Sequence, residues 1–181
     1  MEEPPDIAAF GRRIMIIGPT NAGKSTLAVA IGQKLGIPAR HVDLYRHAPN
    51  TDWVQRSDAE FAALHDAAVA EPEWVMDGNY SALMPGRIAA ATGIVALDDA
   101  LWRRYWRYFA RTLNRQRAGA LEGNRDSIKW AMIHWLWTTR HSAEKYIAMA
   151  RDTGLPLAVC RDQRQLQALY RAWGLSLPSS A

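Results

Sequence analysis

A glycine-rich stretch near the N-terminus contains the residues whose types and spacing most clearly suggest chemistry. It reads Gly18-Pro19-Thr20-Asn21-Ala22-Gly23-Lys24-Ser25-Thr26 and matches the pattern G-x-x-x-x-G-K-[ST]. Gly18 and Gly23 allow the backbone to turn tightly and to approach a ligand where a Cβ would intrude. Successive N–H groups then point into one concavity at the positive end of a helix dipole, where phosphate binds. The pattern therefore predicts a nucleotide-binding loop, with Gly18, Thr20, Asn21, Ala22, Gly23, Lys24, Ser25 and Thr26 as its binding residues.

Two side chains of this loop have separate expected roles. Lys24 reaches the β- and γ-phosphates, and the Ser25 hydroxyl is a ligand for Mg²⁺, so ATP and Mg²⁺ are the predicted cofactors. The alternative is a chance glycine-rich turn between a strand and a helix. The flanks argue against it, because an Ile-rich run at 12–17 precedes the loop and a helical pattern at 24–35 follows it.

Three aspartates follow apolar runs that read as strands. Asp43, Asp77 and Asp98 each end a predicted strand, and the carboxyl ends of parallel strands meet at one edge of a sheet, where ligands bind. Asp77 is the expected second Mg²⁺ ligand beside Ser25, although an ordinary Asp-Gly turn is the alternative for Asp77-Gly78. Asp43 would orient an acceptor hydroxyl or act as its base.

Arginines recur at every fourth position in the second half of the chain. Arg103, Arg107, Arg111 and Arg115 share one helix face, and no acid occurs between residues 100 and 121 to pair with them. Positioned arginines stabilise the charge that develops during phosphoryl transfer, so Arg107, Arg111 and Arg115 join Lys24, Asp43 and Asp77 as catalytic candidates. The alternative is a solvated basic face that pairs with acids elsewhere.

Short apolar runs alternate with helical patterns along the chain, which predicts an α/β fold with a parallel sheet covered on both faces. Trp102, Trp106, Phe109 and Leu113 are the expected core face of one helix, and the Trp-rich segment 130–137 is expected to be core as well. We expect one domain at 12–175 with flexible tails at 1–11 and 176–181. The expected strands are 12–17, 40–44, 73–77, 93–98 and 157–160, and the expected helices are 24–35, 57–70, 85–92, 99–118, 126–151 and 163–173.

Composition limits the function classes. The 181 residues include eight tryptophans, and nearly half are apolar, which excludes a disordered chain. The formal charge of +4 is too small to imply nucleic acid or an anionic membrane by itself, and no apolar run reaches the length of a membrane span. With a single cysteine, Cys160, and an acidic N-terminus, we expect a cytoplasmic protein. The histidines show no metal-ligand grouping.

The chain resembles the small P-loop proteins, related to adenylate kinase, that are called DNA topology modulation proteins. The resemblance spans nearly the whole chain, and its most specific part is the run from Trp74 to Tyr80. The other features are the glycine loop through Ala28, Asp43, Arg87, Leu97-Asp98, Arg107-x-x-x-Arg111, 135–140 and 159–169. It implies a three-layer fold like that of nucleoside monophosphate kinases, with strand order 2-3-1-4-5. It also implies an acceptor flap near 45–72 and a lid near 107–127.

The resemblance also implies the acceptor site. Asp77-Gly78 takes the place of the Asp-Gly pair that lies near Mg²⁺ and the acceptor in nucleoside monophosphate kinases. A Phe-Pro-Arg run follows the pair in those enzymes, whereas Asn79-Tyr80-Ser81 follows it here, and Arg87 would substitute for the missing arginine. The implied acceptor-binding residues are Asp43, Gly78, Asn79, Tyr80 and Arg87.

Two functions remain open from the sequence. The first is an ATP-dependent phosphotransferase whose partners are ATP and a small-molecule acceptor, such as a nucleotide or nucleoside, with no membrane partner. The second is a nucleotide-gated regulator that binds DNA or a protein and hydrolyses ATP slowly at most. The direction of the arginines separates them, because a lid arginine points toward the glycine loop and a DNA-binding arginine points outward.

Overall fold

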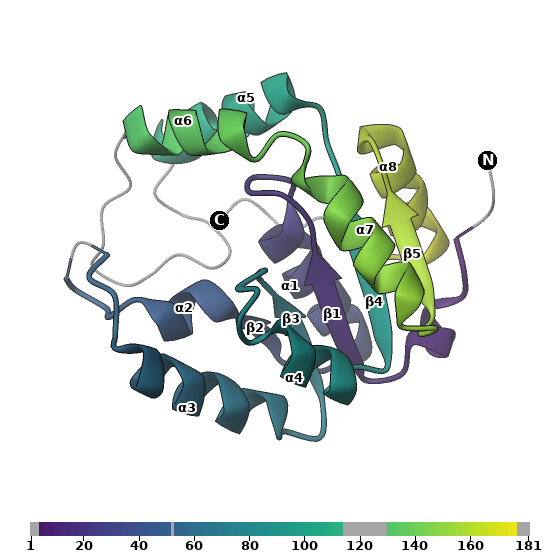
Figure 1. Ribbon diagram of the computed structural model, residues 1–181. Helices are drawn as coiled ribbons and strands as arrows, with labels where there is room; N and C mark the ends of the chain where they lie inside the picture. Colours follow the sequence, from purple (N-terminus) through teal and green to yellow (C-terminus); the bar gives the residue numbers. More distant parts are fainter. Residues whose placement is uncertain (1–3, 52, 114–129, 177–181) are drawn as a thin grey trace.

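A five-stranded parallel sheet forms the centre of the protein, and its strand order is β2-β3-β1-β4-β5 (Figure 1). The computed structural model describes residues 4–51, 53–113 and 130–176. The strands are β1 (Arg13–Ile17), β2 (Ala39–His41), β3 (Trp74–Asp77), β4 (Gly93–Leu97) and β5 (Leu157–Cys160). The predicted α/β class, parallel sheet and strand order are therefore confirmed.

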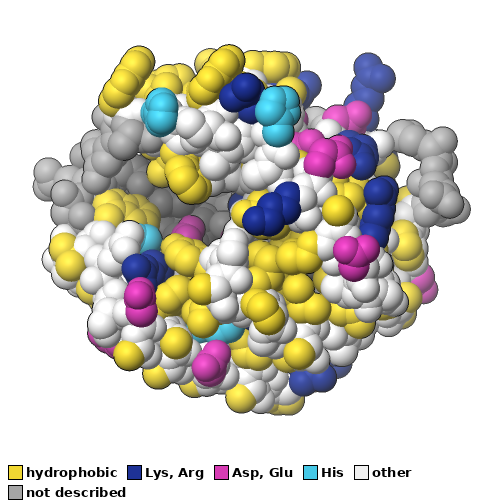
Figure 2. Space-filling view, viewed as in Figure 1, with side chains coloured by type: hydrophobic (Ala, Val, Ile, Leu, Met, Phe, Trp, Pro, Cys, Tyr) yellow, Lys and Arg dark blue, Asp and Glu magenta, His cyan; other side chains and the backbone are white. Residues whose placement is uncertain are grey.

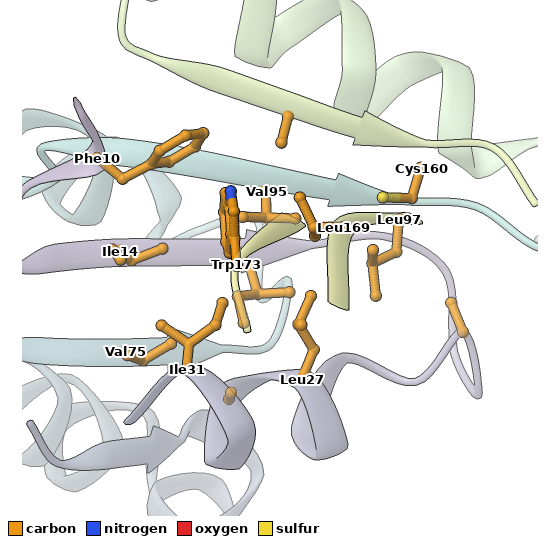
Figure 3. Packing of buried hydrophobic residues seen from close by; sticks show 14 of the residues in the cluster. Phe10, Ile14, Leu27, Ile31, Val75, Val95, Leu97, Cys160, Leu169 and Trp173 are labelled. Carbon is orange, nitrogen blue, oxygen red and sulfur yellow. The ribbon is translucent and has the colours of Figure 1, made fainter. Parts of the chain in front are cut away.

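Successive residues of the central strand point to opposite faces of the sheet, and both faces are buried. Ile14 and Ile16 belong to one apolar cluster, whereas Met15 and Ile17 belong to a second. Helices α1 (Lys24–Leu35) and α8 (Gln163–Ala172) supply the first cluster, part of which Figure 3 shows. Helices α3 (Asp58–Val69), α4 (Met84–Ala90) and α7 (Ser142–Asp152) supply the second.

Local signals explain where several helices begin. The Ser57 hydroxyl accepts a hydrogen bond from the Glu60 N–H at the start of α3, and Asp162 caps α8 through the Gln165 N–H.

Three further helices, α2 (Val42–Arg46), α5 (Leu101–Leu113) and α6 (Trp130–Thr138), lie beyond the carboxyl edge of the strands (Figure 1). The functional side chains are therefore expected at this edge.

The N-terminal segment packs on the sheet, so the prediction of a loose tail at 1–11 is wrong for residues 5–10. Residues Ile7–Phe10 form a turn of 3₁₀ helix, and Phe10 is buried. The Phe10 ring lies 4.9 Å from the Trp173 ring, and Trp173 Nε1 donates to the Pro5 carbonyl oxygen at 2.8 Å. Residues 1–3 and 177–181 of the two predicted tails lie outside the described residues.

Two predicted elements have different bounds in the structure. The strand expected at 40–44 ends at His41, because its neighbour β3 ends at Asp77, the residue that pairs with His41. Asp43 consequently lies in α2 and does not end a strand. The described part of the helix expected at 126–151 is two helices, α6 and α7, and residues 126–129 lie outside the described residues. Thr138 and Thr139 donate their hydroxyls to the Trp135 carbonyl and end α6 there.

The predicted core faces of α5 and α6 are wrong. Trp102 and Trp106 are 65% and 70% exposed, and Trp130 is 79% exposed. Among the described side chains of α5, Arg104 and Tyr108 are buried, so the helix turns Trp102 and Trp106 outward. The side chain of Leu113 lies outside the described residues. Among the described residues, no helix combines the length and apolar character needed to cross a bilayer.

Candidate functional site

The glycine loop lies between the ends of β3 and β4, and two contacts fix it there. Gly18 has φ of +142°, and a Cβ on it would lie 2.3 Å from the Leu97 carbonyl oxygen, so only glycine fits. The second contact is made by the Asn79 side chain with the backbone of Gly18. Its Nδ2 donates to the Gly18 oxygen at 2.8 Å, and its Oδ1 accepts from the Gly18 N–H at 3.3 Å. Asn79, implied as an acceptor residue, thus contacts the loop in this structure.

The start of α1 completes the loop. Gly23, at the N-cap, has φ of +98° and no side chain that would accept from the first-turn N–H groups. Lys24 Nζ donates to the Gly18 and Pro19 carbonyl oxygens at 2.9 and 2.8 Å, so its ammonium lies over the loop. Thr20, Asn21 and Ala22 form the turn, and Thr26 is exposed in the first turn of the helix. A helix N-terminus with an overlying lysine is suited to phosphate.

Ser25 and Asp77, the two residues predicted to hold a metal ion, lie in direct contact. The Ser25 hydroxyl donates to Asp77 Oδ2 at 2.6 Å, and His41 Nδ1 lies 2.5 Å from Asp77 Oδ1. Asp77 is buried, whereas Ser25 is half-buried. A hydroxyl and a carboxylate beside the glycine loop fit Mg²⁺, which takes few protein oxygens and completes its shell with water and ligand oxygens.

Asp43 and Tyr80 form a second contact on the neighbouring side of the edge. The Tyr80 hydroxyl donates to Asp43 Oδ1 at 2.8 Å, and the Tyr80 ring packs edge-on against Phe61 of α3. Burial raises the pKa of Tyr80, and the Asp43 charge raises it further. Asp43 is exposed, so its carboxylate is open to solvent at this edge. Asp98 follows β4, and burial raises the pKa of its carboxyl group.

The turn after β3 is fixed from inside by Arg87. Gly78 has φ of +122°, and a Cβ on it would lie 2.9 Å from Val42 Cβ. Arg87 of α4 is fully buried and donates to the carbonyl oxygens of Gly78 and Asn79. Burial lowers the pKa of Arg87 to about 10. Arg87 therefore positions the turn in this structure and does not reach the surface where an acceptor would bind.

One of the predicted lid arginines contacts the glycine loop. Arg107 donates to the Asn21 carbonyl oxygen at 3.1 Å and to Gln163 Oε1 at 2.8 Å. It also pairs with Asp99 Oδ2 at 2.6 Å, and Arg103 lies 3.9 Å from Asp99 Oδ1. The expectation that these arginines lack a nearby acid in sequence is therefore wrong, because Asp99 directly precedes the interval without acids. The Arg111 side chain and all of Arg115 lie outside the described residues.

Sequence reasoning missed three residues at this edge, namely His41, Asp99 and Arg104. Arg104 is fully buried, and its Nε donates to the Thr20 carbonyl oxygen at 2.9 Å. Its Nη1 and Nη2 have no hydrogen-bond partner among the described residues, and burial lowers its pKa. Helical spacing placed Arg104 opposite the Trp102 stripe, but that stripe was expected to face the core, so the spacing did not mark Arg104 as a site residue. The pairing of His41 with Asp77 is a register of the sheet, and the sequence carried no signal for it.

The site therefore combines the glycine loop, three cations and a hydroxyl–carboxylate pair at one edge of the sheet. Lys24, Arg104 and Arg107 all donate to carbonyl oxygens of the loop, at Gly18 to Asn21. Ser25 and Asp77 lie at the base of the loop, where a metal ion would neutralise phosphate charge. No family model matches this chain, and no curated protein matches it either.

Proposed function

We propose that this protein is an ATP- and Mg²⁺-dependent phosphotransferase of the nucleoside monophosphate kinase-like P-loop class. The observation that carries the proposal is the 2.6 Å contact between Ser25 of the loop and Asp77 at the end of β3. Two residues 52 positions apart in sequence meet where the motif requires a metal ligand. A chance glycine turn would not require a buried carboxylate at this point.

The loop would bind the phosphates of ATP through its N–H groups. Lys24 would exchange its contacts with the Gly18 and Pro19 carbonyls for the β- and γ-phosphates. Ser25 and Asp77 would hold Mg²⁺, directly or through water, and the ion would neutralise charge on the phosphates. Arg107, which already reaches Asn21, would stabilise the charge that develops on the transferring phosphoryl group.

The acceptor would be a small molecule that carries a hydroxyl or phosphate. Asp43 would orient the acceptor or act as its base, and Tyr80 holds the Asp43 carboxylate through its hydroxyl. The flap at 45–72 contains α3 and would cover the acceptor. The placement of Arg104 and Arg107 favours this reading over the DNA-binding regulator, because both guanidinium groups donate to the loop.

Calorimetric titration with ATP tests the nucleotide site. Lys24→Ala should weaken ATP binding about tenfold or more, since a hydrogen-bonded charge on phosphate contributes roughly 1.5–3 kcal/mol. Lys34→Ala is the matched control, because Lys34 is exposed in the last turn of the same helix. Equal ATP affinity of Lys24→Ala and the unchanged protein would contradict the proposal.

Transfer of the labelled γ-phosphoryl group tests the reaction itself. The unchanged protein is incubated with ATP, Mg²⁺ and a panel of nucleotides, nucleosides and small alcohols. At least one acceptor should become phosphorylated, and Asp77→Asn should lower the rate about a hundredfold because a positioned catalytic charge is lost. Normal ATP binding without transfer to any acceptor would support the regulator instead.

A further inference from the structure

The outer side of α5 and α6 exposes an unusual number of aromatic rings. Trp102 and Trp106 of α5 and Trp130 and Trp137 of α6 are each between 53% and 79% exposed. Phe109 lies one turn beyond Trp106 and is also exposed. Monomeric proteins rarely leave contiguous aromatic surface in water unless a partner covers it. We name these five side chains the tryptophan face.

The two rows of rings lie on adjoining helices. The Tyr105 hydroxyl of α5 donates to the Ile133 carbonyl of α6 at 3.1 Å, and Figure 1 shows the two helices side by side above the sheet. Tyr105 is three residues after Trp102 and four before Phe109, so it shares their helix face. Ile133 has the same spacing from Trp130 and Trp137. Apolar side chains gather over this part of the molecule in Figure 2.

The orientation of α5 is opposite to that of most surface helices. An amphipathic helix of a globular protein normally turns its apolar stripe toward the core. Here Arg104 and Tyr108 face inward, and Arg104 contacts the glycine loop. The outward rings therefore contribute little to the core, and a partner that buries them would gain apolar contact area.

The charge around the tryptophan face is positive. Residues 100–113 and 130–143 contain no aspartate or glutamate, and the acid that precedes them, Asp99, is buried and is shared by Arg103 and Arg107. The Arg103 guanidinium lies 4.7 Å from the Trp102 ring centre, and that of Arg140 lies 4.5 Å from the Trp137 ring centre. Indole rings favour the headgroup layer of a bilayer, and arginine binds lipid phosphate. We propose that the tryptophan face docks on the surface of an anionic lipid bilayer.

Two other partners fit these observations less well. A second copy of the chain would bring Arg103 and Arg140 against equivalent cations, and the acid beside Arg103, Asp99, is buried in its pair with Arg107. A nucleic acid needs many arginine–phosphate contacts, but Arg104 is buried and Arg107 is bound to Asp99 and the loop. Among the described residues, the tryptophan face combines its five rings with the guanidinium groups of Arg103 and Arg140, and aromatic rings flanked by basic side chains are typical of interfacial helices. This proposal departs from the sequence-based expectation of no membrane partner.

Sedimentation with lipid vesicles tests the proposal. The full chain should bind vesicles of equal parts phosphatidylcholine and phosphatidylglycerol and should bind phosphatidylcholine vesicles weakly. The double variant Trp106→Gln/Trp130→Gln should lose about tenfold or more of this partitioning, because two rings no longer enter the interface. Intrinsic fluorescence should shift to the blue on binding in the unchanged protein and much less in the variant.

Val54→Gln is the matched control, because Val54 is an apolar side chain 58% exposed in the loop between α2 and α3. It should bind vesicles like the unchanged protein, and ATP affinity should be equal in all three proteins. No vesicle binding, equal binding to neutral vesicles, or unchanged binding of the double variant would each overturn the proposal. Tryptophan-dependent dimerisation or oligonucleotide binding without vesicle binding would overturn it in favour of those partners.

Discussion

At the residue scale, the contact between His41 and Asp77 determines which carboxylate oxygen faces Ser25. His41 Nδ1 donates to Asp77 Oδ1, which leaves Oδ2 for the Ser25 hydroxyl and for Mg²⁺. Partners of this kind orient metal ligands, and their loss costs about 10–100-fold in metal affinity. His41→Leu should therefore raise the Mg²⁺ concentration for half-maximal phosphoryl transfer by about tenfold.

His41→Asn is the conservative variant, because its amide nitrogen takes nearly the place of Nδ1. It should restore most of the Mg²⁺ response, while ATP affinity without metal stays unchanged in both variants. If the leucine and asparagine variants respond to Mg²⁺ alike, His41 does not position Asp77. A general loss of folding would instead lower metal-free ATP binding as well.

The burial of a second histidine, His65, predicts how the stability of the protein depends on pH. His65 of α3 is buried, and its Nε2 has no hydrogen-bond partner among the described residues. Burial lowers the pKa of His65 below its ordinary value of 6.5. At a pH below 6.5, the unfolded chain binds the proton more readily than the folded chain does. The free energy of unfolding therefore falls as the pH decreases from about 6.5.

Urea unfolding at about pH 7 and about pH 5 measures this effect. His65→Leu should remove part of the loss, by at most roughly 1.4 kcal/mol for each unit of pKa shift. The control is His141→Leu, because His141 is exposed. An equal loss of stability in His65→Leu and the unchanged protein would show that His65 does not cause it.

At the element scale, two helical glycines should respond to alanine with opposite signs. A Cβ on Gly86 of α4 would meet open space, whereas a Cβ on Gly32 of α1 would lie 2.8 Å from the Ile37 carbonyl oxygen. Gly86→Ala should stabilise the protein by about 0.5–1 kcal/mol through lower backbone entropy in the unfolded chain. Gly32→Ala should destabilise it by about 1–3 kcal/mol through overpacking. Thermal unfolding of both variants measures the difference, and a gain for Gly32→Ala would contradict the packing argument.

The sequence predicted best those elements that can be identified from their own composition, without knowing what they pack against. Strands β1, β3 and β4 are buried on both faces, and β5 is buried on one face and half-buried on the other, so the apolar composition of each run identifies it. The aromatic stripe of α5 gave the helix correctly but the wrong inward side. Helical spacing defines a stripe without stating what it packs against, and the contact from Arg104 to Thr20 determines the side.

The candidate site likewise contains some residues that the sequence predicted and others that it did not. The spacing within the glycine loop and the strand-end position of Asp77 are local, so the Ser25–Asp77 contact followed from the sequence. The role of Arg87 depended on the turn it supports, which required the tertiary structure. His41 and Arg104 were missed because no motif marks them, and their contacts with Asp77 and Thr20 depend on the sheet register and on which side of α5 faces the loop.

At the scale of the whole molecule, the two ends of the described chain close the same face of the sheet. Phe10 and Trp173 pack together within the first apolar cluster (Figure 3), and Gly93 of β4 lies directly beneath Phe10, where a Cβ would come within 2.6 Å of the ring. The edge with the glycine loop lies at the opposite ends of the strands. A destabilising substitution near Phe10 should therefore affect the glycine loop only by unfolding the whole protein.

Phe10→Ala tests this separation of stability from function. It should lower the free energy of unfolding by about 3–5 kcal/mol, because a fully buried ring leaves a cavity against Gly93 and Trp173. Phe109→Ala removes the same ring from the partly exposed stripe of α5 and should cost less than about 1 kcal/mol. Denaturant unfolding gives both values, and ATP titration well below the transition should give equal affinities. A weaker ATP affinity in folded Phe10→Ala would mean that the N-terminal segment is coupled to the glycine loop through the sheet.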